Sequence, residues 1–174
     1  LRRTETGTVN TDKWFMFGRG QGINYGGIPK LLAPEISFGG NFMFDSNGQY
    51  YSTTKIYGYI KKANCLYSYK FLLGLLNSNL FWFFIQNTGY VLRGGYYTFK
   101  TNYVSPFPVP NYEAIDMRQV SMVENLVDDI LHCKYELTKD EIASYIKDID
   151  KIIYQLYACQ VKMYKQLIYM QPDN

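Results

Sequence analysis

Short apolar and aromatic runs, separated by turn-forming residues, mark the early part of the chain. Residues of β-branched and aromatic type are enriched in strands, and Gly, Pro, Asn and Asp bound these runs. The runs that predict strands are 14–17, 41–44, 49–52 and 55–60. Between the second and third, "DSNG" (45–48) places Asn47 and Gly48 where positive φ closes a turn, so the pattern predicts a hairpin.

A longer apolar segment at 68–86 changes to helical spacing and contains "LLGLLNSNLFWFF" (72–84). Its apolar positions nearly surround the helix axis, which is typical of a helix covered on several sides. A membrane span needs about 20 mostly apolar residues, and this run is interrupted by Asn77, Ser78 and Asn79. The segment therefore predicts one buried central helix, ending at Gly89.

Three closely spaced prolines, Pro106, Pro108 and Pro110, predict an extended boundary, because proline disrupts helices and central strands. Beyond it, apolar residues at helical spacing predict one helix, and the capping-box sequence "TKDE" (138–141) opens a second. The expected fold class is α+β. We predict a mixed β-sheet domain with a buried central helix over 1–111. We also predict a C-terminal helical pair over 112–174, which packs against this domain or serves as a spacer or docking element.

Charge divides the chain more sharply than its net value of +3 indicates. Residues 1–100 contain 11 Lys or Arg and 4 Asp or Glu, whereas residues 101–174 contain 7 and 11. Hydrophobic residues make up 47% and aromatic residues 18%, which favours a folded chain. Three cysteines form no CxxC pair, which favours a reducing, cytoplasmic setting. The first residues show neither a signal-peptide pattern nor an initiator Met, so we expect a piece of a longer polypeptide.

Signatures of catalysis are weak. The glycine-rich "GRGQG" (18–22) has Ile23 where a dinucleotide fingerprint needs glycine, and no Gly-Lys-Ser/Thr of a phosphate loop is present. His132 is the single histidine, and the cysteines lack zinc-ligand spacing, so no metal site is predicted. Neither the Asn/Asp-Pro-Pro-Tyr/Phe motif of amino-methyltransferases nor the Pro-Asp with Glu-x-Lys of metal-dependent nucleases occurs. No catalytic residue is predicted.

Basic side chains in the first part of the chain alternate with tyrosines and amide-bearing residues. Lys and Arg neutralise phosphates or donate to guanine, and Asn and Gln pair bidentately with adenine. This pattern favours nucleic-acid binding. An ordinary basic surface around a tyrosine-rich core remains the alternative.

Five segments in order carry a family resemblance: "KWFMFGRGQGIN" (13–24), "PKLLAPEIS" (29–37), "NFMFDSNGQYYS" (41–52), "FLLGLLNSNLFWFF" (71–84) and "GGYYTFKTNYVSPFPVP" (94–110). Together they resemble the TaqI-like C-terminal specificity domain, the target-recognition region of type IIG restriction-modification enzymes and related adenine methyltransferases. The resemblance implies a non-catalytic unit that binds double-stranded DNA, with "LNS" (76–78) as a turn of the central helix. Methyl transfer, with S-adenosylmethionine and possibly Mg, would belong to a methyltransferase domain elsewhere in the parent protein.

Candidate contacts with DNA follow from the basic, tyrosine-rich pattern and the resemblance. Those for reading bases are Arg19, Gln21, Arg93, Tyr96 and Tyr97. Those for positioning on phosphates are Lys30, Lys55, Lys61, Lys62 and Lys100. Two alternatives stay open: half of a type I specificity subunit, which shares the DNA role, and a module that binds carbohydrate or protein. A neutral glycan would bind with little dependence on salt, whereas DNA binding weakens steeply as salt rises.

Overall fold

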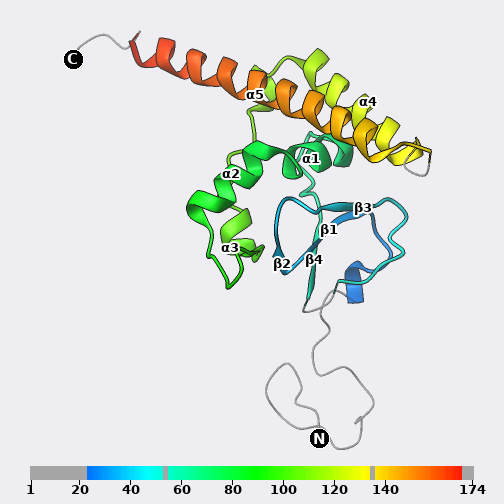
Figure 1. The fold of residues 1–174 in the computed structure, drawn as a ribbon. Coiled ribbons are helices and arrows are strands. Elements are labelled where there is room, and N and C mark those ends of the chain that lie inside the picture. The colour runs from blue at the N-terminus through cyan, green and yellow to red at the C-terminus, as the bar shows by residue number, and fades with distance from the viewer. Residues whose placement is uncertain (1–22, 53–54, 134–135, 170–174) are drawn as a thin grey trace, which may run out of the picture.

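The computed structural model describes residues 23–52, 55–133 and 136–169, and the predicted strand at 14–17 lies outside them. The α+β class is confirmed, with two long helices above a smaller layer of strands (Figure 1). The elements are η1 (Ile23–Tyr25), β1 (Lys30–Pro34), β2 (Ile36–Ser37), β3 (Met43–Asp45), β4 (Ile56–Tyr59), α1 (Tyr69–Leu76), α2 (Asn79–Thr88), β5 (Tyr97–Thr98), α3 (Thr101–Val104), η2 (Tyr112–Ala114), α4 (Met117–Cys133) and α5 (Lys139–Tyr169).

The strands form two small antiparallel sheets, β3-β1-β4 and β2-β5. The predicted sheet was mixed, but every strand pair in the described ranges is antiparallel. Glu35, between β1 and β2, joins the two sheets. Its N–H donates to the Lys55 carbonyl at 2.8 Å, and its carbonyl accepts from the Phe99 N–H at 2.8 Å. Backbone hydrogen bonding therefore runs without a gap from one sheet to the other.

The predicted strands are partly right. The run 55–60 contains β4, and 41–44 overlaps β3, but 49–52 forms no strand. The predicted hairpin is therefore wrong, because β3 pairs with β1 instead. Gly48 does adopt a positive φ of 66° in the turn after β3, but Asn47 does not. Among the described residues, the non-glycine residue with positive φ is Asn41.

The apolar segment at 68–86 forms two helices, so the prediction of one central helix is wrong. α1 ends at Leu76, and Ser78 caps α2 by accepting from the Phe81 N–H. Between them the Asn77 amide bonds both backbone groups of Phe42, at 2.8 and 3.0 Å. "LNS" is therefore a junction between helices. Gly89 does end α2, but with φ of −84°, which requires no glycine.

The predicted C-terminal helical pair is present as α4 and α5, which run in opposite directions along the top of the molecule (Figure 1). The capping box also forms, since the Thr138 N–H donates to Glu141 at 2.8 Å. α4 packs on α1, and Phe71, Val123 and Ile153 share one buried core. The division at residue 111 stays a prediction, and the core is continuous across it. Within the described ranges, none of the helices has the length and apolar character of a membrane span.

Gly74 sets the distance between α1 and α4. A β-carbon added there would lie 2.8 Å from Val123 Cγ1 and 3.1 Å from Val127 Cγ2. We expect Gly74→Ala to lower the free energy of unfolding by about 1–2 kcal/mol, because overpacking outweighs the better helix propensity of alanine. Urea unfolding of the purified chain measures this difference.

Val123→Ala supplies the matched control for this interpretation. The loss in the double variant Gly74→Ala, Val123→Ala should be smaller than the sum of the two single losses, because the shortened side chain makes room for the new methyl group. Additive losses would show that the two positions do not clash.

Candidate nucleic-acid interface

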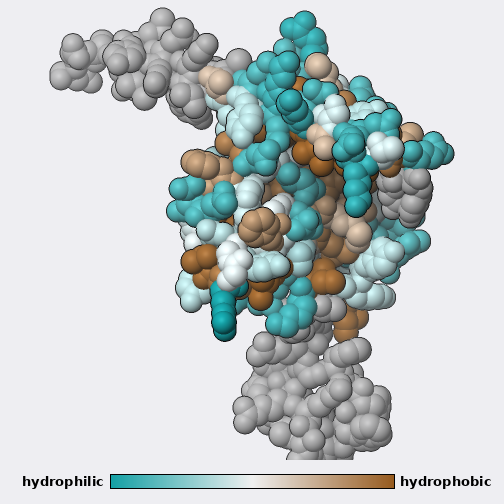
Figure 2. Space-filling view, viewed as in Figure 1, coloured by the Kyte–Doolittle hydropathy of each residue, from teal (hydrophilic) through white to brown (hydrophobic). Residues whose placement is uncertain are grey.

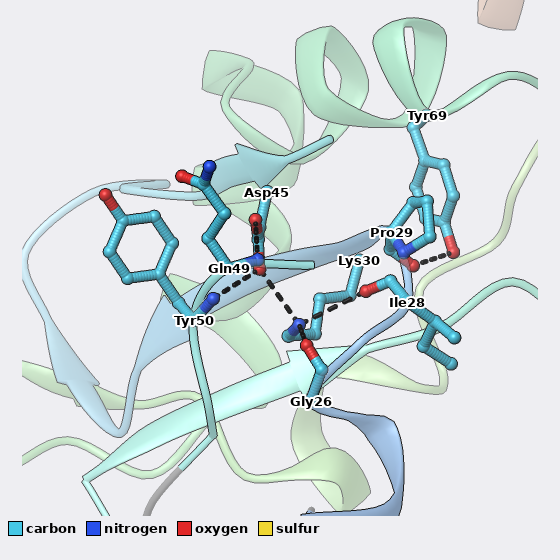
Figure 3. Close-up of polar contacts among 8 residues, drawn as sticks. All are labelled: Gly26, Ile28, Pro29, Lys30, Asp45, Gln49, Tyr50 and Tyr69. Carbon is cyan, nitrogen blue, oxygen red and sulfur yellow. Dashed lines mark hydrogen bonds and ion pairs between the residues drawn. The ribbon is translucent and has the colours of Figure 1, made fainter. Parts of the chain in front are cut away.

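A buried ion pair joins the first residue of β1 to the last residue of β3. Lys30 Nζ lies 2.9 Å from Asp45 Oδ2, and the side chains are 1% and 2% exposed. The same ammonium donates to the carbonyls of Gly26 and Ile28, each at 3.2 Å (Figure 3). All three donors of the ammonium therefore have an acceptor.

The Asp45 carboxylate holds the turn that follows β3. It accepts from the backbone N–H of Gln49 at 2.9 Å and of Tyr50 at 3.0 Å (Figure 3). Burial acts to raise the pKa of Asp45, but the hydrogen bonds from Lys30 and these amides prevail and hold the pKa below its ordinary value of 3.8. The carboxylate is therefore ionised at neutral pH, and the pair ties the turn at 46–50 to the backbone at 26–28.

This arrangement contradicts the predicted role of Lys30 on a phosphate. Its ammonium is enclosed and fully bonded, so contact with DNA would require breaking the ion pair. No local pattern indicated this burial, because a lysine at the start of a strand is usually exposed. Lys30 instead supports the loops around it.

A tight turn after α2 presents Arg93 and Tyr96 at the surface. The Leu92 N–H donates to the Tyr96 carbonyl at 2.6 Å, which closes the turn. Gly94 and Gly95 have φ of 87° and 80°, values that favour glycine. Arg93 and Tyr96 are both exposed, so two of the predicted base-reading residues come together at one loop tip.

An aromatic cluster supports this turn. Phe38, itself exposed, lies 5.5 Å from Trp82 and 6.0 Å from Tyr96 between ring centroids. Tyr97 is half-buried and packs edge-on against Trp82 at 5.3 Å. Tyr97 therefore contributes to the packing under the turn. Sequence reasoning missed Phe38 and Trp82, because no local pattern shows that β2 and α2 meet at this turn.

The predicted phosphate-contacting lysines differ in their surroundings. Lys55 is exposed and pairs with Glu35 at 3.1 Å. Lys61 is half-buried, donates to the Tyr67 carbonyl and lies 5.4 Å from the centre of the Tyr69 ring. The Lys61 ammonium is thus held in place by contacts within the protein.

Lys62 and Lys100 are exposed, and Lys100 lies directly before α3. Together with Arg93 and Lys55, they are the predicted DNA-contacting cations that are exposed within the described residues. Arg19 and Gln21 lie outside the described residues. Their segment leads into η1, which begins at Ile23.

Potential metal ligands do not form a cluster among the described residues. In the part of the chain that the structure describes, no group of three or more His, Cys, Asp or Glu could hold a metal ion. His132 lies on α4, 3.1 Å from Asp128. The arrangement of the described residues is suited to binding, since it combines exposed cations with exposed aromatic rings.

Comparison with known proteins identifies one family. Residues 3–109 match the family model of the TaqI-like C-terminal specificity domain. The matched range includes both loops held by the ion pair and the turn that carries Arg93. No curated protein matches the chain significantly.

The ion pair makes a prediction about stability. Lys30→Met should lower the free energy of unfolding by about 3–5 kcal/mol, because it leaves Asp45 charged and buried without its partner. Lys55→Met is the matched control, since removal of an exposed pair costs about 0–1 kcal/mol. Denaturant unfolding at pH 7 compares them, and equal small losses would contradict the assignment.

The lowered pKa of Asp45 also predicts a dependence on pH. A depressed carboxyl pKa contributes stability above the unfolded value, and this contribution disappears as the pH falls through the folded value. The stability difference between the wild type and Lys30→Met should therefore narrow as the pH falls below 3.8. Unfolding curves at pH 7, 5 and 3 measure the trend, and a constant difference would contradict it.

Proposed function

Because the chain belongs to the TaqI-like C-terminal specificity domain family, we propose that it selects the site at which a type IIG-like restriction-modification enzyme acts on double-stranded DNA. The family assignment confirms the resemblance seen in the sequence and supports a DNA-recognition role in restriction-modification. Beyond this role, we propose the type IIG class of enzyme and a division of the described residues into base contacts and phosphate contacts.

The observation that carries the proposal is the turn at 92–96. It holds Arg93 and Tyr96 outward on a tight, glycine-containing backbone, supported by Phe38 and Trp82. An arginine presented in this way can donate two parallel hydrogen bonds to guanine in the major groove. Apolar side chains reach the surface among hydrophilic ones on the lower left of the body, around α2 and α3 (Figure 2).

The division of labour follows from exposure. We assign Lys62 and Lys100 to phosphate contacts, because their side chains are exposed, whereas the exposed Lys55 pairs with Glu35. We assign Arg93 and Tyr96 to contacts with base edges, together with Arg19 and Gln21 of the glycine-rich segment. α4 and α5 lie on the opposite side of the body from η1 (Figure 1), so the carboxylates of these helices are not next to phosphates near η1.

In this proposal the parent protein is a cytoplasmic adenine DNA methyltransferase, with or without endonuclease activity. S-adenosylmethionine, and Mg where cleavage occurs, act in its catalytic domain, and the chain described here contributes the choice of site. Half of a type I specificity subunit is the second candidate with the same DNA role. A carbohydrate- or protein-binding module is the candidate of a different class.

The first test is a salt titration of the purified chain with a pool of randomised duplexes, followed by sequencing of the retained DNA. We expect affinity to fall steeply with salt and a short motif to be enriched. Salt-sensitive binding without enrichment would mean that selection requires the parent enzyme. Absence of duplex binding at low salt would reject the proposal in favour of a glycan- or protein-binding module.

Single substitutions separate the two kinds of contact. Arg93→Ala should relax preference at one base position, with a loss of about 1–3 kcal/mol for a bidentate contact. Lys62→Ala should weaken all duplexes alike and flatten the dependence of affinity on salt. Competition binding with the enriched duplex and scrambled duplexes measures both effects.

Lys147→Ala provides the control, because Lys147 is an exposed lysine on α5. It should leave both affinity and preference unchanged. The same loss of preference from Arg93→Ala and Lys62→Ala would contradict the partition of contacts.

A further inference from the structure

Two neighbouring loops, 23–28 and 46–52, carry exposed tyrosine and amide side chains but no Asp, Glu, Lys or Arg. Tyr25, Tyr50 and Tyr51 are 54%, 55% and 60% exposed. We call these two segments the paired loops. Exposed aromatic residues that stand alone are ordinary on protein surfaces, but three on adjoining loops form a patch that calls for an explanation.

Close backbone contact brings the paired loops together. A β-carbon added to Gly48 would lie 2.5 Å from the backbone of Gly27 and Ile28. One added to Gly26 would lie 2.0 Å from the Tyr51 ring, so this ring rests directly on the backbone of the other loop. The tyrosines therefore belong to one surface.

The Lys30–Asp45 ion pair fixes both loops from beneath. Lys30 bonds the carbonyls of the first loop, and Asp45 bonds the amides of the second. Figure 3 shows the Gln49 and Tyr50 side chains extending away from the Lys30 ammonium, on the outer side of the turn. The exposed groups thus stand on a backbone that is already ordered before a ligand binds, which lowers the entropic cost of binding.

The chemistry of the paired loops suits base edges and sugars better than phosphates. Tyrosine combines a large ring with a hydroxyl that donates and accepts, and amides can bond adenine bidentately. Uncharged groups displace no counterions, so their contacts add affinity and selectivity without a dependence on salt. The glycine-rich segment with Arg19 and Gln21 leads directly into the first loop.

We propose that Tyr25, Gln49, Tyr50 and Tyr51 form an uncharged DNA-contact surface, which helps to select the duplex site beside the cationic contacts. This inference rests on the proposed function and deepens it. η1 lies at the far side of the sheet from α4 and α5 (Figure 1), so DNA at the paired loops would lie away from these helices and their carboxylates.

The test compares substitutions in the full chain on the duplex enriched by selection and on scrambled duplexes. Tyr50→Ala and Tyr51→Ala should each weaken binding to the enriched duplex by roughly 3- to 10-fold, the equivalent of one neutral hydrogen bond. The loss on scrambled duplexes should be smaller, and the slope of affinity against salt should not change. Tyr154→Ala, at an exposed tyrosine of α5, should have no effect on binding.

Gly26→Ala provides a second variant that leaves every tyrosine in place. The added methyl group would displace the exposed Tyr51 ring, which can swing into solvent at little cost to the fold. It should reproduce the binding loss of Tyr51→Ala, with an unchanged melting temperature.

The outcomes separate this inference from the proposed function. If the wild type binds the enriched duplex and Tyr50→Ala, Tyr51→Ala and Gly26→Ala bind it with the same affinity, the inference is overturned. The proposed function would still stand. A changed salt slope in the tyrosine variants would also overturn the inference, because the surface would then act through charged groups. Failure of the wild type to bind any duplex would reject the proposed function and the inference together.

Discussion

The ion pair between Lys30 and Asp45 is the constraint on which the paired loops depend. Two charges in a protein interior are costly unless each is paired and hydrogen-bonded. Here the ammonium has three acceptors and the carboxylate accepts two backbone amides in addition to its partner. Because the two residues are also opposite each other in the β1–β3 ladder, one interaction sets a strand register and the path of two loops. Such a network specifies a geometry more than it adds net stability.

The C-terminal helices are part of the same folded body, which bears on their predicted role as a spacer or docking element. Asp150 of α5 is buried and accepts from the Asn79 backbone and side chain at 2.7 and 2.6 Å, so it caps the start of α2. Burial raises the pKa of Asp150 despite these bonds. Ser68, which caps α1, also bonds Glu124 of α4. α1 and α2 thus depend on the C-terminal pair for the caps at their N-terminal ends and for their cover.

Local patterns predicted those features that depend on local physics. Helical spacing and a capping box located α4 and α5, and β-branched and aromatic composition located β4. β1 escaped prediction because Lys30 to Ala33 are all buried, so the strand shows no alternation of polar and apolar positions. The break between α1 and α2 escaped because it depends on a hydrogen bond between Asn77 and the distant Phe42.

The candidate site shows the same difference between features set by local sequence and features set by tertiary contacts. Arg93 and Tyr96 could be singled out from composition, since glycines beside a basic residue indicate an exposed turn. The burial of Lys30 and the restraint of Lys61 could not, because both depend on partners brought in by tertiary structure. A cluster of basic residues in the sequence therefore predicts a positively charged surface. It does not predict whether a particular lysine is exposed on that surface or buried.

The paired loops are attached to the scaffold through their main chain. The bonds that hold them end on the carbonyls of Gly26 and Ile28 and the amides of Gln49 and Tyr50, groups that every residue except proline provides in full. The identity of most loop side chains is thus decoupled from the anchoring. A scaffold built in this way can exchange its surface residues one at a time while the anchor remains intact. In the proposed role, new target preferences would therefore be accessible by point substitution without loss of the fold.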